Sequence, residues 1–506
     1  MSPAPSPGTP HPGTDTGTDT APAGSTGTAS GARSATAVDP GTLETGGTEA
    51  GGGTARTLPP LALRERPGRW LDGYRPEDPA FWESTGRPIA RTNLRWSILA
   101  EFLGFAVWQL WAITVVFLPD AGFTLTDAQI FWLLSLPSLV GATLRVPYTF
   151  TVGRFGGRNW TVVSALLLLV PTVGLALAVS DPATPFWVLL ALAGTAGFGG
   201  GNFASSMANI TYFYPAREKG YALGLNAAGG NLGTAVAQLV VPLAVTVGAA
   251  GALALPLAGW IWVPLILLAA WGARTHMHNL SDATGDVAGS LATVKEPHFW
   301  VMSFLYIGTF GSFIGFSSVF PKLITDVFPE FSTFTVGTAA LSLAFLGPLV
   351  GSVARPWGGR LADRFGGAAM TTAVFAVMAL LALAVVLTLP LASFWLFLGL
   401  FLLLFTAAGM GNGTTYRMIP TIYRVRGAGG AGGVSAERKA SAALGLIGAV
   451  GAYGGFAIPQ VLSLSSGATG GYGTAFLGFV GFYVLALAVT WACYLRPGSA
   501  MAAHRV

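Results

Sequence analysis

Charged residues are scarce in this chain. Only 10% of its 506 residues are Asp, Glu, Lys or Arg, whereas 52% are hydrophobic. A soluble domain carries about 25% charged residues, so a soluble globular fold is excluded for most of the chain. Cysteine is almost missing as well, since Cys493 stands alone. This excludes a framework of intrachain disulfides and argues against a thiolate metal cluster.

The first 55 or so residues lack the apolar core of a signal peptide. They consist of Pro, Gly, Ser, Thr and Ala with scattered acids, a composition that cannot bury a core. We therefore predict that residues 1–55 form a disordered cytoplasmic tail. Residues 56–93 mix Arg, Glu, Pro and Trp, and we expect a short cytoplasmic lead-in there.

Long apolar runs are present instead, and each is long enough to cross a bilayer as a helix. Lipid offers no partner for bare backbone amides, and the runs are too long and too uniformly apolar for the strands of an outer-membrane barrel. We predict an all-α membrane protein with twelve transmembrane helices. They are expected at 94–118, 128–151, 160–179, 186–213, 220–244, 253–273, 298–321, 335–357, 368–389, 393–416, 440–462 and 473–495.

The basic residues predict the topology. All 27 Lys and Arg residues except Lys322, Arg145 and Arg355 fall in alternate loops or in the termini. The positive-inside rule then places both termini in the cytoplasm of a multi-pass protein of the cell membrane. The topology also explains the pI of about 9.4 without a nucleic-acid partner. The expected parts are an N-terminal six-helix bundle at 94–273, a cytoplasmic loop at 274–297, a C-terminal bundle at 298–495 and a cytoplasmic C-terminus at 496–506.

An internal repeat relates the two halves. "GATLRVPYTFTVGRFGG" at 141–157 matches "GSVARPWGGRLADRFGG" at 351–367, so Arg145 aligns with Arg355 at an offset of 210 residues. Parallel repeats of this kind are typical of secondary transporters, which bind substrate between the halves near the midplane. "GGRLADRFGG", with Asp363 and Arg364, resembles the loop between spans two and three, and eight and nine, of the major facilitator superfamily. We therefore expect two pseudo-symmetric six-helix bundles.

Arg145 is predicted to lie about 21 Å into its span, where exposure to lipid is costly. Three interpretations remain open for Arg145 and Arg355. They snorkel to the cytoplasmic surface, they form an ion pair with Glu101, or they bind an anion. Glu101 is the only acid within a predicted span, and one acid cannot neutralise two arginines. The repeat favours the anion site, because related spans aim both side chains at one point.

The guanidinium group is planar, permanently charged and forked, which suits planar oxyanions. Nitrate, nitrite and carboxylates all fit this description. The glycine-rich loop "RGAGGAGGVSA" follows an apolar helix and lacks Gly-Lys-Ser/Thr, so it does not predict a phosphate site. No metal-ligand set and no nucleophile–base pair occurs in the spans, so we expect neither an enzyme nor a cofactor. The residues alone thus predict an anion carrier, with a passive anion channel as an alternative.

Four segments narrow the prediction: "LRVPYTF", "GFGGGNFASSMANI", "ALGLNAAGGNLG" and "YIGTFGSFIGFS". With them the chain resembles the nitrate/nitrite porter family of the major facilitator superfamily from about residue 70 to 495. The resemblance implies a paired-arginine anion site at Arg145 and Arg355, an aromatic sandwich and a donor amide. It implies conformational or packing roles for the motif glycines and for the loop pair Asp363 and Arg364. The implied residues are Phe203, Tyr306 and Phe310 for the sandwich, Asn231 for the amide, and Gly200, Gly224, Gly230, Gly233, Gly445 and Gly451 for packing.

The resemblance also implies alternating access to a fixed site, with nitrate and nitrite as the carried anions. Two like charges repel in the empty site and a bound anion bridges them, so we expect nitrate/nitrite antiport. Net uptake against the membrane potential instead requires co-transported protons, and Glu101 is then either a proton carrier or a structural tether. Proton symport and another small planar anion such as formate are the alternatives. We expect a monomer in membrane lipid.

Overall fold

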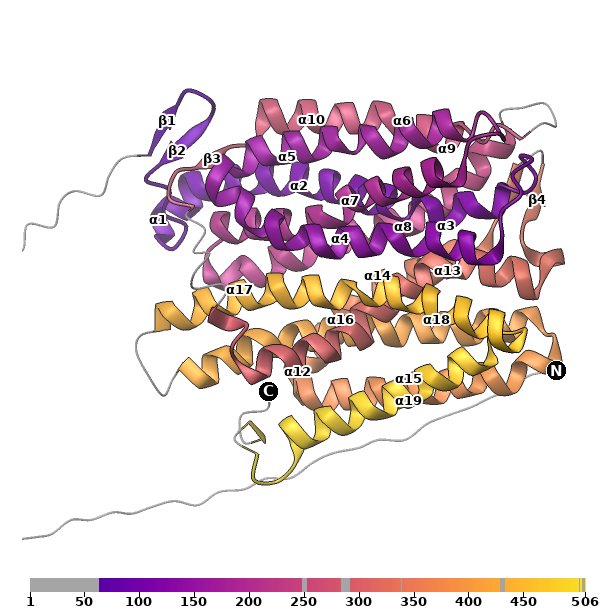
Figure 1. The fold of residues 1–506 in the computed structure, drawn as a ribbon. Coiled ribbons are helices and arrows are strands. Elements are labelled where there is room, and N and C mark those ends of the chain that lie inside the picture. Colours follow the sequence, from indigo (N-terminus) through magenta and orange to yellow (C-terminus); the bar gives the residue numbers. More distant parts are fainter. Residues whose placement is uncertain are drawn as a thin grey trace, which may run out of the picture. The chain divides into compact units, whose positions relative to one another are not determined.

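The computed structural model describes residues 63–247, 253–283, 292–337, 339–427, 433–499, 501–502 and 506. The predicted tail at 1–55 lies outside these residues. Long helices run side by side in two bundles, with the first half of the chain in one bundle and the second half in the other (Figure 1). Two short strands, β1 (Arg64–Arg66) and β2 (Trp70–Asp72), mark one end of the bundles. We refer to this end as the basic end and to the opposite end as the Asp127 end.

The first half contains ten helices within the described residues. They are α1 (Pro79–Phe81), α2 (Arg87–Trp108), α3 (Leu110–Thr114), α4 (Asp127–Phe155), α5 (Gly157–Leu167), α6 (Leu169–Ala178), α7 (Phe186–Phe213), α8 (Ala216–Val247), α9 (Leu257–Trp260) and α10 (Val263–His276). A π-helical turn, η1 (Trp82–Gly86), joins α1 to α2, and a 3-10 turn, η2 (Val115–Phe117), follows α3.

The second half repeats this arrangement. Its helices are α12 (Pro297–Tyr306), α13 (Ser312–Val327), α14 (Leu346–Phe365), α15 (Gly367–Thr388), α16 (Phe394–Gly427), α17 (Gly433–Ala452), α18 (Gly454–Thr469) and α19 (Gly473–Thr490). A π-helical turn, η3 (Ile307–Gly311), joins α12 to α13, and another, η7 (Trp491–Leu495), follows α19. The 3-10 turns are η4 (Pro329–Phe331), η5 (Leu343–Phe345) and η6 (Leu389–Leu391).

The two repeated arginine helices end in the same way. α4 stops at Gly156, with φ of 84°, and α14 stops at Gly366, with φ of 93°. A side chain is strained at such angles, so glycine is the residue that ends both helices cleanly. α4 also begins with a capping box, in which Thr126 and Gln129 exchange side chain–backbone hydrogen bonds. These local signals set the length of the helix that carries Arg145.

The predicted all-α membrane fold is confirmed. Within the described residues, ten helices are long and apolar enough to cross a membrane, and the bent pair Pro79–Trp108 and Leu110–Phe117 adds an eleventh. The first predicted span is thus bent, by 41°, at Gln109. α14 corresponds to the eighth predicted span and is the one predicted span missing from this set, because its charged residues Arg355, Arg360, Asp363 and Arg364 lower its hydropathy.

The eighth predicted span, 335–357, is wrong at both ends. Its first part forms two antiparallel strands, β4 (Phe334–Val336) and β5 (Ala339–Leu341), instead of a helix. Thr335 and Val336 are β-branched residues that favour strands, and apolarity alone did not distinguish them from a helix start. The other end is also different, because residues 358–365 of the predicted loop continue α14 up to Phe365.

A small sheet at the basic end was not predicted. β1 pairs antiparallel with β2, and β2 pairs parallel with β3 (Asn279–Leu280), which follows α10. The segment before the first span is therefore tied to the segment between the halves. Arg66 donates a 2.7 Å hydrogen bond to Ser281, and Arg69 donates to the carbonyl of Thr275. Nothing in the sequence pattern pairs these two distant segments.

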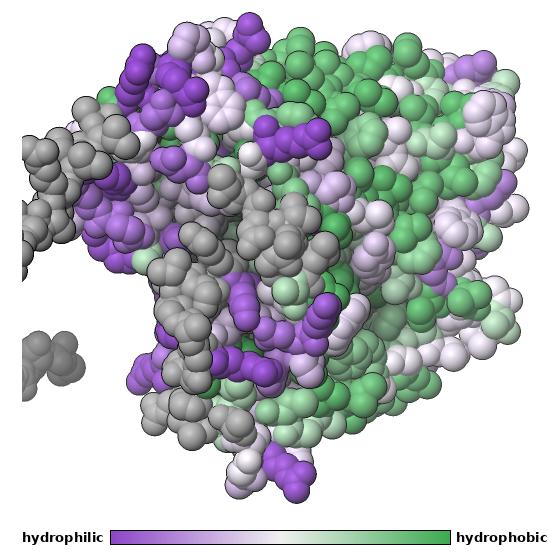
Figure 2. All heavy atoms as spheres, turned by 60° about the vertical axis from the view of Figure 1, so that its left-hand side comes forward, coloured by the Kyte–Doolittle hydropathy of each residue, from purple (hydrophilic) through white to green (hydrophobic). Residues whose placement is uncertain are grey.

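The two halves meet along five helices in particular. α4 packs on α17 and α18, and α8 packs on α14. Hydrophobic side chains cover the lateral surface, while hydrophilic ones gather toward the basic end (Figure 2). Large apolar residues such as Trp187, Leu380 and Leu464 are more than 60% exposed. Such a surface is stable in lipid and unstable in water, which agrees with a membrane-spanning body.

Candidate anion site

Arg145 lies inside the protein, at the contact between the halves. Its side chain is fully buried. Nε donates a 2.9 Å hydrogen bond to the carbonyl of Gly200 on α7, and Nη1 donates a 2.9 Å bond to the carbonyl of Gly448 on α17 in the other half. These bonds fix the guanidinium plane. Snorkelling to a surface, one of the three interpretations, does not describe this buried geometry.

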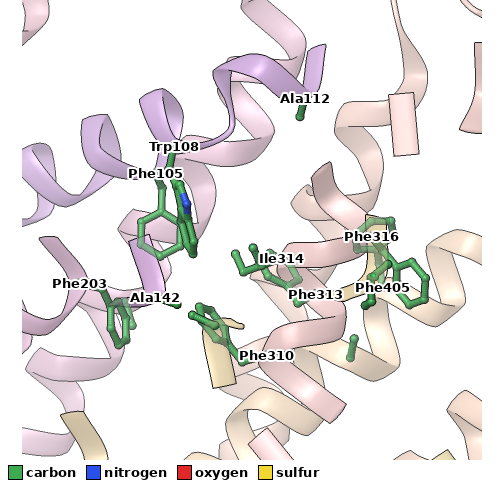
Figure 3. Close-up of a cluster of buried hydrophobic side chains, with 14 of the residues drawn as sticks. Phe105, Trp108, Ala112, Ala142, Phe203, Phe310, Phe313, Ile314, Phe316 and Phe405 are labelled. Carbon is green, nitrogen blue, oxygen red and sulfur yellow. The ribbon is translucent and has the colours of Figure 1, made fainter. Parts of the chain in front are cut away.

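Three aromatic rings surround the Arg145 guanidinium. Its carbon Cζ lies 4.7 Å from the centroid of Phe203, 4.9 Å from that of Phe310 and 5.2 Å from that of Trp108. Phe203 and Phe310 come from different halves and are stacked at 6.2 Å. Figure 3 shows Phe105, Trp108, Phe203 and Phe310 converging on this region. Cation–π contacts of this kind stabilise a buried guanidinium in place.

Arg355 approaches the same ring from the other half. Its side chain is 6% exposed, and its Cζ lies 6.0 Å from the Phe203 centroid and 5.5 Å from that of Tyr416. Both guanidinium carbons are therefore within 6.0 Å of the centre of one phenylalanine ring. The repeat predicted that the two arginines point to one place, and the structure brings them together there.

Each arginine keeps a donor without a partner. Arg145 Nη2 and Arg355 Nη1 are buried and make no hydrogen bond. No ion pair among the described residues includes either arginine. Two buried positive charges without a bound acid are costly, and free N–H groups on both favour a small anion that accepts from each.

Tyr306 and Phe310 complete the aromatic part of the site. Both are fully buried, and their rings stack at 5.3 Å. The Tyr306 hydroxyl donates a 2.8 Å hydrogen bond to Asn412 Oδ1 on α16. The predicted rings thus lie around the Arg145 guanidinium, and Tyr306 connects them to α16.

The predicted glycines differ in how tightly they are packed. An added Cβ meets Trp108 at Gly200, Glu101 at Gly230, the backbone of Phe102 at Gly233 and Tyr306 at Gly451, in each case at 2.7 Å or less. At these four positions the lack of a side chain permits helix contact. At Gly445 the nearest atom is 3.4 Å away, and Gly224 has open space beside it, so close packing does not explain these two.

Asn231 and Glu101 are both buried, and among the described residues neither is hydrogen-bonded to Arg145 or Arg355. Both side-chain atoms of Asn231 lack a partner. Glu101 Oε2 accepts a 2.7 Å bond from Ser206, and no described ion pair links Glu101 to an arginine. The second interpretation, an ion pair with Glu101, is therefore not what the structure contains.

The motif residues Asp363 and Arg364 lie at the basic end, away from the arginine pair. Asp363 accepts a hydrogen bond from Arg417 Nε, which joins the end of α14 to α16. Arg364 lies over the ring of its neighbour Phe365, with Cζ 5.1 Å from the centroid. Both side chains therefore act at the helix end and not in the site.

The sequence interpretation missed Trp108, Tyr416 and Gly448. Trp108 donates a 2.8 Å bond to the carbonyl of Pro137 and lies over Arg145. Gly448 supplies only a backbone carbonyl, which no side-chain pattern reveals. The chain has 15 Trp and 12 Tyr residues, so a single aromatic residue gave no signal of its own.

A cleft of about 590 Å³ opens at the Asp127 end, but it does not suit an anion. Asp127 and Asp326 line it together with Tyr472. Two carboxylates repel an anion, whereas the arginine pair attracts one. The arginine pair is therefore the better candidate for an anion site.

The chain matches the model of the Major Facilitator Superfamily over residues 99–459. It is 45% identical to the nitrate/nitrite transporter NarU of Salmonella typhimurium, over 70% of this chain and 79% of that protein. It is 38% identical to the probable nitrate/nitrite antiporter NarK2 of Thermus thermophilus, over 72% of this chain and 86% of that protein.

Solved structures agree with the fold. The bacterial homologue of the human lysosomal transporter Spinster, in an inward-facing and occupied conformation, has a TM-score of 0.60 at 18% identity and covers 80% of this chain and 97% of that one. The nucleoside transporter NupG has a TM-score of 0.57 at 13% identity and covers 79% of this chain and 99% of that one. At these identities the likeness concerns the fold alone.

Proposed function

Because the chain belongs to the nitrate/nitrite porter family of the major facilitator superfamily, we propose that it carries nitrate and nitrite across the membrane, chiefly by exchanging one for the other. The observation that carries the proposal is the pair of buried arginines from different halves, each with a free donor beside one phenylalanine ring. NarU and NarK2 are named for nitrate and nitrite, which are planar oxyanions that match this donor pair.

The proposed site residues are Arg145 and Arg355 for the charge, with Phe203, Tyr306 and Phe310 as the aromatic enclosure. The rings exclude water, which strengthens the contacts of the arginines with an anion. Asn231 is proposed as an amide donor, because its buried side chain has no other partner. No metal and no cofactor enters this proposal, and the expected unit is a monomer.

Alternating access supplies the mechanism. Hydrogen bonds between the halves occur at the arginine level and toward the Asp127 end: Thr143 with Tyr453, Ser135 with Gln460, and Asp127 with Lys322. The partners on α4 all lie between Arg145 and the Asp127 end of this helix. This supports a state in which the Asp127 end is closed. Rocking of the two halves then exposes the arginine pair to either side in turn.

The orientation follows from charge. We propose that the basic end faces the cytoplasm of a cell membrane, with both termini inside, since nearly all Lys and Arg residues outside the spans lie there. The tail at 1–55, the lead-in at 56–93, the bundles at 94–273 and 298–495, and the cytoplasmic segments at 274–297 and 496–506 are proposed as the organisation of the chain.

Exchange follows from the charges of the site. Without an anion, two buried guanidinium groups repel each other, so closing the halves around them is unfavourable. A bound anion bridges them, and the loaded carrier reorients more readily than the empty one. A carrier of this kind returns only when it is loaded, which makes nitrate moving one way and nitrite moving the other the favoured cycle.

Uptake of nitrate into proteoliposomes tests the proposal. The vesicles contain either nitrite or an inert buffer, and the membrane potential is held at zero. We expect rapid uptake with internal nitrite and much slower uptake with the inert buffer. Equal uptake in both conditions contradicts exchange and indicates a channel, and absence of uptake in both contradicts nitrate as the substrate.

Net uptake with a co-transported proton is a second candidate, favoured by one observation. Glu101 is a fully buried carboxylate that is not in an ion pair. Uptake of one anion against a membrane potential costs about 2.3 kcal/mol per 100 mV, which a co-transported cation offsets. An inward proton gradient imposed on vesicles without nitrite distinguishes this candidate from exchange.

A further inference from the structure

A buried hydrogen bond joins α8 of the first half to α13 of the second half. Gln238 donates from Nε2 to the main-chain carbonyl of Ser317 at 2.6 Å, and both residues are fully buried. The sequence explains why this carbonyl is available. Pro321 lies inside α13 and has no N–H, so the carbonyl of Ser317, four residues earlier, lacks its usual helical donor. Gln238 therefore supplies, from the other half, the donor that α13 does not have.

Gln238 lies between the arginine pair and the Asp127 end. An added Cβ at Gly230 lies 3.2 Å from the ring of Phe105, which packs on Phe203 at 6.1 Å, so Gly230 marks the level of the arginine pair. Thr246, near the end of α8, accepts a 2.8 Å bond from a main-chain N–H of β5, and the β4–β5 hairpin lies at the end opposite β1 and β2 (Figure 1). Gln238 is thus about 12 Å farther along α8 than Gly230, toward the Asp127 end.

Two other polar side chains follow the same face of α8. Asn231, Thr234 and Gln238 are three and four positions apart, a spacing that places them on one side of a helix. All three are at most 1% exposed. Among the described residues, Thr234 Oγ1, Gln238 Oε1 and both polar side-chain atoms of Asn231 have no hydrogen-bond partner. The face thus carries unused polar groups from the arginine level outward.

Thr234 differs from other threonines of the spans. A threonine inside a helix commonly donates to the carbonyl one turn earlier, as Thr143 of α4 and Thr246 of α8 do at 2.8 Å and 2.7 Å. The hydroxyl of Thr234 makes no such bond within the part of the chain that the structure describes. A buried hydroxyl without a partner is destabilising, so we infer that another state of the carrier supplies the partner.

Opening of the Asp127 end changes what Gln238 can bind. Because α8 and α13 belong to different halves, their separation breaks the bond to Ser317 and frees the amide N–H groups. Gln238 then offers donors one helical turn from the hydroxyl of Thr234, and an oxyanion can accept from both. α8 has no charged residue between Asn231 and Val247, so nothing on this stretch of the helix repels an anion.

We propose that Thr234 and Gln238 form a second, outer subsite for a planar oxyanion, through which the anion reaches the arginine pair when the Asp127 end is open. The proposal rests on the proposed function, since it adds a binding step to the same cycle. Neutral donors bind an anion more weakly than guanidinium groups do, so the anion moves on to the arginines. In the closed state the carbonyl of Ser317 holds the Gln238 amide, and the subsite exists at one end of the carrier only.

The test measures nitrate/nitrite exchange from each end separately. Right-side-out and inside-out membrane vesicles are prepared from cells without another nitrate carrier, and external trypsin identifies the preparation that exposes the basic end. The half-saturating concentration of external nitrate is determined with saturating internal nitrite. Absence of exchange by the wild type contradicts the proposed function and the subsite with it. Exchange by the wild type upholds the proposed function, and the variants then test the subsite alone.

Thr234→Val removes the free hydroxyl and breaks no described hydrogen bond. It is expected to raise the half-saturating nitrate concentration at the Asp127 end at least threefold and to leave the value at the basic end unchanged. Thr234→Ser keeps the hydroxyl and should behave as the wild type. A wild-type value for Thr234→Val at the Asp127 end, or an equal change at both ends, overturns the proposal.

Gln238→Met removes both the donor and the bond between the halves. Gln460→Met is the matched control, because Gln460 of α18 also donates across the halves, to Ser135 of α4 at 2.7 Å. Loss of a closing bond alone favours the state open at the Asp127 end and therefore lowers the half-saturating concentration there. We expect this decrease in Gln460→Met and a value at least threefold higher in Gln238→Met. If both variants give the same decrease, Gln238 only closes the carrier and the subsite is contradicted.

Discussion

Single residues determine how closely the site is enclosed. Gly451 lies against Tyr306, and an added Cβ would be 2.4 Å from the ring carbon Cδ1. Tyr306 is held by its bond to Asn412 and its stacking on Phe310, so the ring has little freedom to move. Because Gly451 has no side chain, it leaves room for the Tyr306 ring of the proposed site. Gly451 has this effect without contacting the anion itself.

Gly451→Ala is expected to slow nitrate/nitrite exchange about tenfold or more, because overpacking of this kind costs about 1–3 kcal/mol. Initial exchange rates in proteoliposomes, normalised to the amount of inserted protein, measure the effect. Gly399→Ala on α16 is the control, since an added Cβ there meets nothing within 4 Å. Equal rates for both variants would show that the Tyr306 ring position is unimportant.

The arginine pair was predictable from the sequence because the internal repeat has an arginine at the same position in each half. A charged residue within an apolar span is costly, so its presence indicates a function. The resemblance to a family supplied the rings. Trp108 and Gly448 were not predictable, since one is an aromatic residue among many and the other contributes a backbone carbonyl. A small cavity beside Glu101 was also missed, because it depends on serines of three helices that look ordinary in the sequence.

At the Asp127 end, an ion pair joins helix α13 of the second half to helix α4 of the first half. Lys322 of α13 is 6% exposed and bonds Asp127 of α4 at 3.1 Å and Asp326 at 2.8 Å. The first of these bonds crosses from one half to the other. Opening this end must break it, so the bond favours the state described here.

Lys322→Met is expected to favour the state that is open at the Asp127 end. A cysteine placed at Ser135, which is buried and accepts a bond from Gln460, reports this opening in a Cys493→Ser background. Its rate of modification by a thiol reagent should rise about threefold or more, since the lost ion pair is worth about 1 kcal/mol. Lys439→Met is the control, because Lys439 pairs with Glu296 within the second half. An unchanged rate in Lys322→Met contradicts the closing role.

The small sheet at the basic end depends on a neutral histidine. His278 Nε2 lies 2.6 Å from Arg69 Nη2, and its backbone N–H donates to Asn93 Oδ1. Burial, followed by the charge of Arg69, lowers the pKa of His278 from 6.5 to about 4. Because the pKa is lowered in the folded state, the stabilisation is complete above pH 6.5 and is lost as the pH falls toward 4.

Hydrogen exchange of residues 64–72 is therefore expected to be faster at pH 5 than at pH 7.5, after correction for the intrinsic rate. His278→Gln should remove this pH dependence, since the amide oxygen accepts from Arg69 at any pH. His276→Gln, two residues earlier, should keep it. If His278→Gln has the pH dependence of the wild type, the histidine is not the group that titrates.

Helix positions were largely predictable, since apolar length is the dominant signal in a membrane protein. The predicted 186–213 coincides with α7. The failure at 335–341 has a physical reason: β4 and β5 are largely apolar, but the β-branched residues Thr335 and Val336 of β4 favour a strand. The pairing of β2 with β3 could not be predicted, because it joins residues about 200 positions apart through backbone bonds alone.

On the scale of the whole molecule, the central feature is that each half supplies one arginine to a single place. Neither half contains both arginines, so in the proposed function the halves must approach each other around the anion. This requirement connects binding to the rocking motion, and it explains why a site at the interface serves exchange.

A double-mutant cycle tests most directly whether Arg145 and Arg355 act on one anion at a shared site. Exchange rates are measured for Arg145→Lys, Arg355→Lys and the double variant, with Arg360→Lys on the exposed side of α14 as the control. Each single change keeps the charge but loses the fork, and should slow exchange about tenfold or more, since hydrogen bonds to charged groups are worth about 1.5–3 kcal/mol. Residues that hold one anion are not independent, so the double variant should be much faster than the product of the two single effects predicts. If the two effects simply multiply, the arginines act at separate places and the shared site is contradicted.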